Sequence, residues 1–300
     1  MVRPRQQSLV EPMINIDPKK PRGIVWLASY PKSGNTWLRV FLYHYTRILS
    51  GAPREADELN KLDRSSGYES KLFGLFERLL EKPLTEASRL EVMSVRAQVQ
   101  LTVAERIDSI VFLKTHNLLG ELDGMPTINL AVSAGGVYIV RDPRDVAPSL
   151  AKHIGTDIDR AIEVMRTPAF ATENDKETAF EIWGSWSEHV DSWGIEPNRS
   201  VLVVRYEDMI AKPMETFGAI LRHLGQNPKE EVMAEAIELS SFDQLKQQET
   251  QSGFRERSPR ADRFFISGTA GGWRDKLTEQ QAQAIVAHHR KEMAYFGYLD

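Results

Sequence analysis

The stretch "GIVWLASYPKSGNTWLR" (Gly23–Arg39) decides the fold. It begins with an apolar run, Gly23–Ser29, that is rich in β-forming residues and lacks polar alternation, as is typical of a strand buried on both faces of a parallel sheet. Apolar residues then recur at helical spacing over Thr36–Leu49, and "SGAP" ends the helix. A strand, a tight turn and a helix form a phosphate-binding geometry, because backbone N–H groups at a helix N-terminus point at an anion.

The turn between this strand and helix gathers hydrogen-bond donors and one positive charge. Gly34 lets the backbone approach a ligand closely, while Ser33, Asn35 and Thr36 add polar side chains. Lys32 supplies a point charge. The turn is not a Walker A loop, in which the lysine follows the last glycine. The alternative interpretation is an ordinary turn with a solvated lysine.

The rest of the chain alternates between buried strands and helices, which predicts a single α/β domain whose central parallel sheet is flanked by helices on both faces. We expect residues 1–22 to form a loose arm, residues 23–300 to form the domain, and residues 251–276 to form a long loop. The remaining predicted strands are 109–116, 136–143 and 200–208. The remaining predicted helical segments are 54–108 (with loops near 65–67 and 82–83), 178–193, 212–224 and 278–293.

Composition narrows the class of protein. The chain has 300 residues, of which 41% are hydrophobic and 27% charged, as in ordinary globular proteins. A net charge of −4 argues against a nucleic-acid partner, and the absence of cysteine excludes disulfides and thiolate chemistry. No apolar run approaches the roughly 18 residues that span a bilayer, and the N-terminal stretch lacks the apolar core of a secretory signal. We therefore expect a cytoplasmic protein without stable membrane insertion.

A histidine ends the second predicted strand, in "KTH" (Lys114–His116). Residues at the carboxyl edge of parallel strands face the ligand crevice of doubly wound folds. A lone histidine is more often structural than catalytic, but His116 differs from the others by its place at a strand end beside Lys114. The histidines interpreted as structural are His44, His153, His189, His223, His288 and His289.

The third predicted strand runs into a strong helix start in "RDPRDVAPS" (Arg141–Ser149). Asp142-Pro143 combines a preferred N-cap residue with proline at the first helical position. Pro148 predicts a kink or an early break, because proline removes a helical hydrogen bond. Apart from phosphate binding, the charged residues here permit a surface cluster of ion pairs.

These motifs occur together and in order, and with them the chain resembles the cytosolic-type sulfotransferases that depend on 3′-phosphoadenosine 5′-phosphosulfate (PAPS), a P-loop-related α/β family. The stretches that carry the resemblance are "YPKSGNTW", "KTH", "RDPRDVAPS" and "RYED". Asn35 stands where the family usually has threonine. The resemblance spans about residues 24–293.

The resemblance implies transfer of a sulfuryl group from PAPS to a hydroxyl of a small-molecule acceptor: an alcohol, phenol, lipid or glycolipid. By resemblance, His116 is the base that deprotonates the acceptor, as an imidazole can near neutral pH. Lys32 and Lys114 would neutralise the charge that gathers at the leaving phosphate. The family needs no metal ion.

The resemblance also implies a set of donor-binding residues. Arg141 and Ser149 would bind the 3′-phosphate, Tyr206 would contact adenine, and Ser240 and Phe242 would frame it with Trp37 on the opposite face. Core packing is the alternative for the aromatic side chains. The full predicted set is Ser33, Gly34, Asn35, Thr36, Trp37, Arg141, Ser149, Tyr206, Ser240, Phe242 and Gly268.

The C-terminal loop departs from the family pattern. Where the family has R-K-G-x-x-G-D-W, this chain has "ISGTAGGW" (Ile266–Trp273), so an Arg-Lys pair that grips the 3′-phosphate is missing. Each lost charge-assisted contact is worth roughly 1.5–3 kcal/mol. The dimerisation motif is also incomplete, so no oligomeric state is predicted. The candidates to replace the pair are Arg255, Arg257, Arg260 and Arg263.

Two other functions stay open at this point. A P-loop nucleotide or small-molecule kinase shares the strand–loop–helix, although it lacks support from a Walker A lysine or from an Mg²⁺ carboxylate other than Asp208. A catalytically idle nucleotide-binding protein would explain the altered C-terminal loop.

Overall fold

The computed structural model describes residues 2–4, 22–55, 57–195, 199–257, 262–266 and 268–299. They belong to two compact units, each treated by itself below. The first unit comprises 1–31, 67–138 and 164–203, and the second comprises 32–66, 139–163 and 204–300. Most of the predicted N-terminal arm, and the Arg260 and Ser267 positions, lie outside the described residues.

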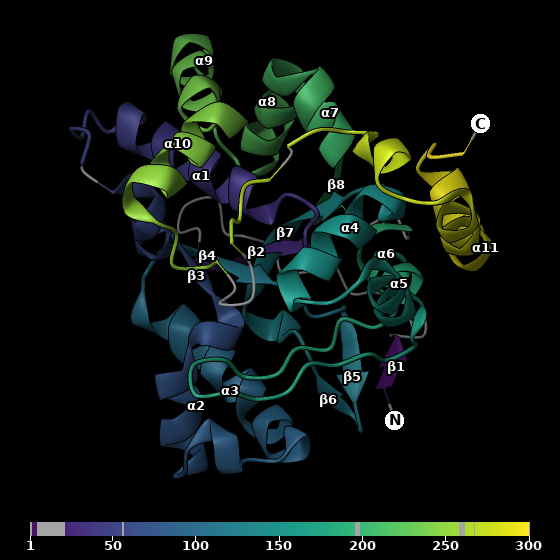
Figure 1. Ribbon diagram of the computed structural model, residues 1–300. Coiled ribbons are helices and arrows are strands. Elements are labelled where there is room, and N and C mark those ends of the chain that lie inside the picture. The colour runs from purple at the N-terminus through teal and green to yellow at the C-terminus, as the bar shows by residue number, and fades with distance from the viewer. Residues whose placement is uncertain are drawn as a thin grey trace. The chain divides into compact units, whose positions relative to one another are not determined.

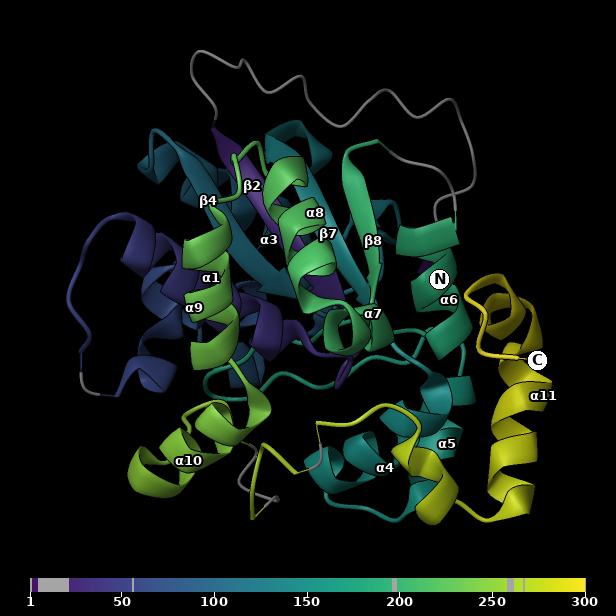
Figure 2. The same ribbon diagram turned by 90° about the horizontal axis from the view of Figure 1, so that it is seen from above.

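A five-stranded sheet in the order β3-β4-β2-β7-β8 holds the first unit together. Figure 2 shows β4, β2, β7 and β8 side by side. Together with its flanking helices this is the α/β fold that the sequence predicts. The boundaries shift by a few residues, and the short β3 is an addition, because residues 65–67 were expected to be a loop. The strands are β3 (Ser66–Tyr68), β4 (Ile110–Thr115), β2 (Gly23–Ser29), β7 (Ser133–Val140) and β8 (Val201–Arg205).

The register of the two strands β2 and β4 decides where the site lies. They pair in parallel, with Ala28 opposite Thr115. Ser29, the last residue of β2, and His116, which directly follows β4, are thereby brought side by side at the carboxyl edge of the sheet.

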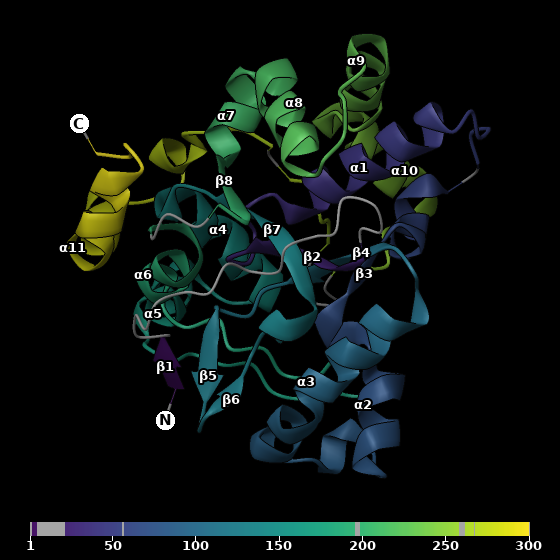
Figure 3. The ribbon, with the colours of Figure 1, turned by 180° about the vertical axis from the view of Figure 1, so that it is seen from behind.

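Helices and a small antiparallel sheet complete the first unit (Figures 1 and 3). The helix α3 packs against α2 and against the strands β2 and β4. A cluster that includes Phe76, Val92 and Phe180 forms its apolar core. The three-stranded sheet has the order β1-β5-β6. Besides the five-stranded sheet, the elements of the first unit are β1 (Val2–Pro4), η2 (Glu69–Lys71), α2 (Phe73–Leu80), η3 (Leu84–Glu86), α3 (Arg89–Arg106), β5 (Gly120–Leu122), β6 (Met125–Pro126), η4 (Leu130–Val132), α6 (Trp186–Val190) and η5 (Asp191–Ile195).

The helix predicted over 178–193 is wrong for its first half. Only α6 and the π-helical turn η5 form there, and the backbone before them is extended, with a bridge between Ala171 and Ile182. The reason is that this backbone pairs with distant groups: the Ile182 N–H donates to the Asn117 side chain, and its carbonyl accepts from the Leu118 N–H. Long-range hydrogen bonds replace those of a helix.

The second unit is mainly helical. Its helix α1 packs against α9 (Figure 2), and α4 contacts α11 and η6. The helix α4 begins as predicted, with the Asp142 side chain accepting from the Arg144 N–H and proline at the first position, but it continues through Pro148, so no early break occurs. The elements are α1 (Asn35–Leu49), η1 (Glu58–Arg64), α4 (Pro143–Ile154), α5 (Ile158–Arg166), α7 (Tyr206–Ala211), α8 (Pro213–His223), α9 (Glu230–Leu239), α10 (Phe242–Ser252), η6 (Gly272–Asp275) and α11 (Glu279–Tyr295).

Candidate active site

The ring of His116 is oriented by the neighbouring strand. Its Nδ1 lies 2.7 Å from the carbonyl oxygen of Ser29. A carbonyl oxygen can only accept a hydrogen bond, so Nδ1 is the donor and carries a hydrogen. In the neutral form of the ring the lone pair is therefore on Nε2, which makes Nε2 the basic nitrogen.

Two buried side chains hold the main chain of His116. Its N–H donates to Glu181 Oε1 at 3.2 Å, and its carbonyl accepts from His189 Nε2 at 3.1 Å. His189 in turn accepts from the Tyr138 hydroxyl at Nδ1, at 3.0 Å. Burial lowers the pKa of His189 to about 3, so its ring stays neutral and keeps one donor and one acceptor. His116 is therefore fixed at three atoms.

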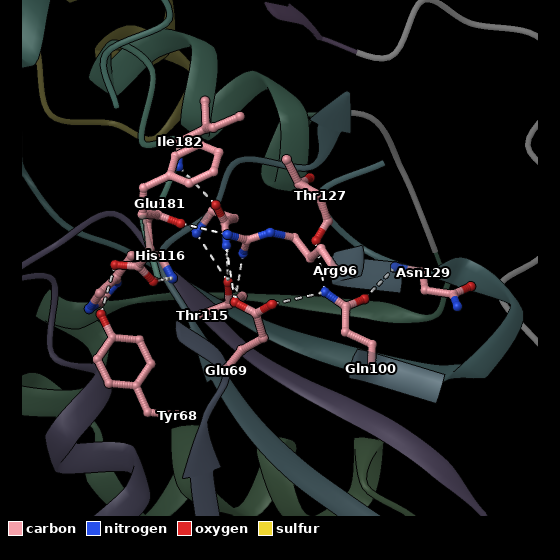
Figure 4. A network of polar contacts seen from close by, with 12 residues as sticks. Tyr68, Glu69, Arg96, Gln100, Thr115, His116, Thr127, Asn129, Glu181 and Ile182 are labelled. Carbon is pink, nitrogen blue, oxygen red and sulfur yellow. Dashed lines mark hydrogen bonds and ion pairs between the residues drawn. The ribbon is translucent and has the colours of Figure 1, made fainter. Parts of the chain in front are cut away.

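Tyr68 links the two predicted catalytic residues of this unit. Its hydroxyl donates to Glu181 Oε2 at 2.8 Å (Figure 4). The ammonium of Lys114 lies 3.9 Å from the centroid of the Tyr68 ring, a cation–π contact, and the His116 ring meets the same ring nearly edge-on at 5.8 Å. Lys114 and His116 thus contact one tyrosine, which Glu181 orients.

A buried ion pair supports this end of the sheet (Figure 4). Glu69 and Arg96 are both fully buried, with Arg96 Nη1 2.8 Å from Glu69 Oε2. Gln100 and Asn117 also donate to the Glu69 carboxylate. Burial raises the pKa of Glu69, and the charge of Arg96 opposes that rise. Asn117 follows His116 in the chain, so the network reaches the main chain at the site.

In the second unit, the loop before α1 has an unusual backbone. Lys32 and Gly34 both adopt positive φ, +68° and +106°. Left-handed residues alternating along a loop turn successive N–H groups toward one side, as in anion-binding nests. A Cβ at Gly34 would lie 2.6 Å from the ring of Tyr206, so only glycine fits.

Arg141 ties this loop to the C-terminal glycine-rich segment. Its Nη1 donates to the carbonyl of Lys32 at 3.1 Å and its Nη2 to the carbonyl of Thr269 at 3.0 Å. The guanidinium lies 4.2 Å from the centroid of the Tyr206 ring. Ser149 lines a pocket together with Lys32. The structure therefore brings together residues predicted to bind the 5′-phosphosulfate, the 3′-phosphate and adenine.

Buried polar atoms in this unit fit an anionic nucleotide. Within the part of the chain that the structure describes, the Ser33 hydroxyl, the Trp37 indole nitrogen and Arg141 Nε are buried and have no hydrogen-bond partner. Each can donate a hydrogen bond, and buried donors are normally paired. Phosphate oxygens of PAPS would supply acceptors for donors of this kind.

The C-terminal segment is held by Asp145. One carboxylate oxygen accepts from the Gly271 N–H at 2.6 Å and the other from the Trp273 N–H at 2.8 Å. Gly268 has φ +58°, and a Cβ there would lie 2.2 Å from the Phe242 ring, so both backbone conformation and close packing require glycine. The family's glycine positions thus keep a packing role although the Arg-Lys pair is absent.

The predicted adenine-binding residues are only partly assembled. Trp37 meets Tyr206 edge-on at 5.8 Å, and Trp37 and Phe242 both pack against the apolar cluster around Val40. The Ser240 hydroxyl donates to the carbonyl of Ile237 in α9, the helix that Ser240 caps. The roles of these residues stay predictions.

Sequence reasoning missed three residues that surround His116. Tyr68 and Glu181 carried no motif, and Glu181 lay in a stretch expected to be helical. His189 was interpreted as structural, and it is a buried residue that holds the His116 carbonyl, a link to the site that the sequence did not reveal. None of the three could be found without knowing which distant segments meet, because 48 to 73 residues separate them from His116 along the chain.

The described residues contain no group of three or more histidine or acidic side chains that could hold a metal ion. None of the helices in the described ranges has the length and apolarity needed to cross a membrane.

Comparison with known proteins places the chain in a class. The sulfotransferase domain family matches residues 22–297. Bovine sulfotransferase 1A1 is 27% identical over 275 residues, covering 89% of this chain and 82% of the relative. Two solved structures of retinol dehydratase are also similar, and each match covers 94% of this chain and 84% of the retinol dehydratase chain. The complex with retinol and PAP has a TM-score of 0.62 at 20% identity. The complex with androsterone and PAP has a TM-score of 0.61 at 19% identity.

The likeness to these structures shows that the chain has the P-loop-like α/β fold. The chain belongs to the sulfotransferase family. It is a PAPS-dependent sulfotransferase, which confirms the class predicted from the four ordered motifs.

Proposed function

We propose that this enzyme transfers a sulfuryl group from PAPS to the hydroxyl of an apolar small molecule, with His116 as general base. The carrying observation is that His116 is anchored at Nδ1, at its N–H and at its carbonyl, with Nε2 as the basic nitrogen. A base must be held within hydrogen-bond reach of the proton that it removes, and three anchors serve that purpose.

When bound, PAPS supplies the sulfuryl group. The bond between sulfur and the phosphate oxygen breaks, its electrons stay on that oxygen, and PAP is the product. His116 Nε2 takes the proton of the acceptor hydroxyl while the acceptor oxygen bonds to sulfur. Lys32 and Lys114 balance the charge that grows on the leaving phosphate oxygen. Tyr68 and Glu181 fix the position of Lys114 and of the His116 main chain.

The donor is held by residues of the second unit. We assign the phosphates to the loop that contains Lys32 and Gly34 and to Arg141 and Ser149, and we assign adenine to the aromatic residues nearby. Among the described residues, three buried donors without a hydrogen-bond partner support this assignment: the Ser33 hydroxyl, the Trp37 indole N–H and Arg141 Nε. The proposed donor-binding set is Ser33, Gly34, Asn35, Thr36, Trp37, Arg141, Ser149, Tyr206, Ser240, Phe242 and Gly268.

The bound molecules of similar structures support an apolar acceptor. The two retinol dehydratase structures are complexes with retinol and with androsterone. We propose an apolar alcohol or phenol for this chain, with lipids and glycolipids as wider candidates. The cytoplasmic location and the single-domain organisation expected from the sequence stay predictions.

The test measures PAP binding by calorimetry and incubates the enzyme with PAPS and a library of hydroxyl compounds. We expect one acceptor class to gain one SO₃ unit by mass spectrometry, with activity retained in a chelator. His116→Ala should lose about 10²–10⁴ in kcat while it keeps PAP binding. His288→Ala changes an exposed histidine and is the matched control.

The same experiment separates the alternatives. Loss of turnover in chelator would favour a metal-dependent kinase. PAP binding with no sulfated product from any acceptor, unchanged by His116→Ala, would favour an idle nucleotide-binding protein. Absence of both binding and product would overturn the proposal.

A further inference from the structure

Basic side chains from three segments line one pocket of the second unit. Lys32 follows β2, Lys152 and His153 lie near the end of α4, and Arg263 lies in the described stretch before Gly268. Among the residues that the structure describes, no acidic side chain lines this pocket. Like charges around one hollow repel each other, and an anion of two charges removes that repulsion.

One face of α4 points at this pocket. Ser149 and Lys152 are three residues apart and His153 is four residues from Ser149, so the three lie on the same side of the helix. Ser149 is the residue assigned above to the 3′-phosphate. Lys152 therefore stands one helical turn from a proposed phosphate ligand.

Neither Lys152 nor Arg263 has a counter-ion within the described ranges. No ion pair or side-chain hydrogen bond is found there for either of them. Other arginines of the C-terminal loop behave differently: Arg257 donates to the Asp262 carbonyl, and Arg255 does not line the pocket. Two basic side chains without a counter-ion therefore line the same pocket. This arrangement indicates an anionic ligand.

The missing family residues give the anion its identity. Ile266 stands where the family has an arginine for the 3′-phosphate, and its apolar side chain lines the same pocket. Arg263, three residues earlier, brings a guanidinium to that pocket, and a guanidinium can donate two parallel hydrogen bonds to a phosphate. We propose that Arg263 and Lys152 bind the 3′-phosphate of PAPS in this chain, in place of the absent Arg-Lys pair. This inference rests on the proposed donor site.

The test compares two nucleotides that differ only in the 3′-phosphate: PAP and adenosine 5′-phosphate. Calorimetry on the full chain gives a Kd for each with wild type, Arg263→Ala, Lys152→Ala and the control Arg255→Ala. We expect Arg263→Ala and Lys152→Ala each to weaken PAP by about tenfold or more and to leave adenosine 5′-phosphate unchanged, because the lost contact is charge-assisted. Arg255→Ala should change neither.

The unchanged binding of adenosine 5′-phosphate also reports that each variant is folded. If the variants bind PAP as wild type does, or lose both nucleotides to the same degree, Arg263 and Lys152 do not read the 3′-phosphate and only this inference falls. If wild type binds neither nucleotide, the donor site itself is wrong, and this assignment falls with it.

Discussion

Removing the carboxylate of Glu181 should damage catalysis without damaging donor binding. Glu181 accepts three hydrogen bonds: from the His116 N–H at 3.2 Å, from the Tyr68 hydroxyl at 2.8 Å and from the Trp183 indole at 3.4 Å. It is only 3% exposed. Alanine removes both acceptor oxygens and so all three hydrogen bonds, whereas glutamine keeps one carbonyl oxygen for the His116 N–H and an amide that can donate to Tyr68.

The magnitude follows from these contacts. A buried donor left without a partner costs about 1–3 kcal/mol, and hydrogen bonds to a charged group contribute about 1.5–3 kcal/mol each. Because water can reach half-buried Tyr68, we expect Glu181→Ala to lose about 3 kcal/mol of unfolding free energy and Glu181→Gln about 1 kcal/mol. A displacement of the base by about 1 Å can cost roughly 10²-fold in rate, so kcat should fall about 10- to 100-fold in Glu181→Ala.

The assay is initial-rate sulfation with the acceptor found in the library, together with urea unfolding and PAP calorimetry. We expect kcat to fall in the order wild type, Gln, Ala, with the Kd for PAP unchanged. Restoring most of kcat with glutamine would show that hydrogen-bond geometry, rather than negative charge, is what His116 requires.

The reasoning would be refuted by a folded Glu181→Ala enzyme with the kcat of wild type. An equal loss of kcat in the glutamine and alanine variants would refute the geometric part, since glutamine retains the acceptor for the main chain. A weaker PAP affinity in proportion to the lost kcat would point to a global change instead.

Three further predictions concern parts that support the site. Asp145→Asn should weaken PAP binding about tenfold, because one of the two backbone N–H groups that position the glycine-rich segment loses its acceptor; calorimetry and limited proteolysis of that segment check this. Arg96→Met should cost about 3–5 kcal/mol in urea unfolding, because it leaves Glu69 buried and unpaired, and adding Glu69→Leu should recover much of the loss. The pKa of His189 is lowered to about 3 in the folded protein, so its stabilising effect is full above the unfolded pKa near 6.5 and is lost as pH falls from 6.5 toward 3. Wild type should therefore lose about 1.4 kcal/mol more per pH unit than His189→Gln in that window, and equal slopes would contradict this.

The strand, turn and helix around Gly34 could be predicted closely from the sequence. The observed β2 spans the expected residues, and α1 begins one residue early. The start of α4 could also be predicted from the sequence, because Asp142-Pro143 is a local N-cap signal. Signals of this kind act over a few residues and need no knowledge of what packs against them.

Prediction failed where the backbone pairs with distant groups. The stretch before α6 has the composition of a helix, yet the Phe180 N–H bonds to the Asn174 side chain and the Ala179 N–H to the Ser70 carbonyl. In that stretch tertiary contacts outweigh local preference. Pro148 was expected to cause a kink or an early break in α4, and the helix continues through it without a break.

The sequence by itself determined the class of enzyme and the residues predicted for its chemistry, because Lys32, His116 and Arg141 stand in motifs set by neighbouring residues. Only the tertiary structure decided how His116 is held. Glu181 and His189 lie 65 and 73 residues away along the chain, and they meet its main chain because the fold buries their polar groups where partners are required.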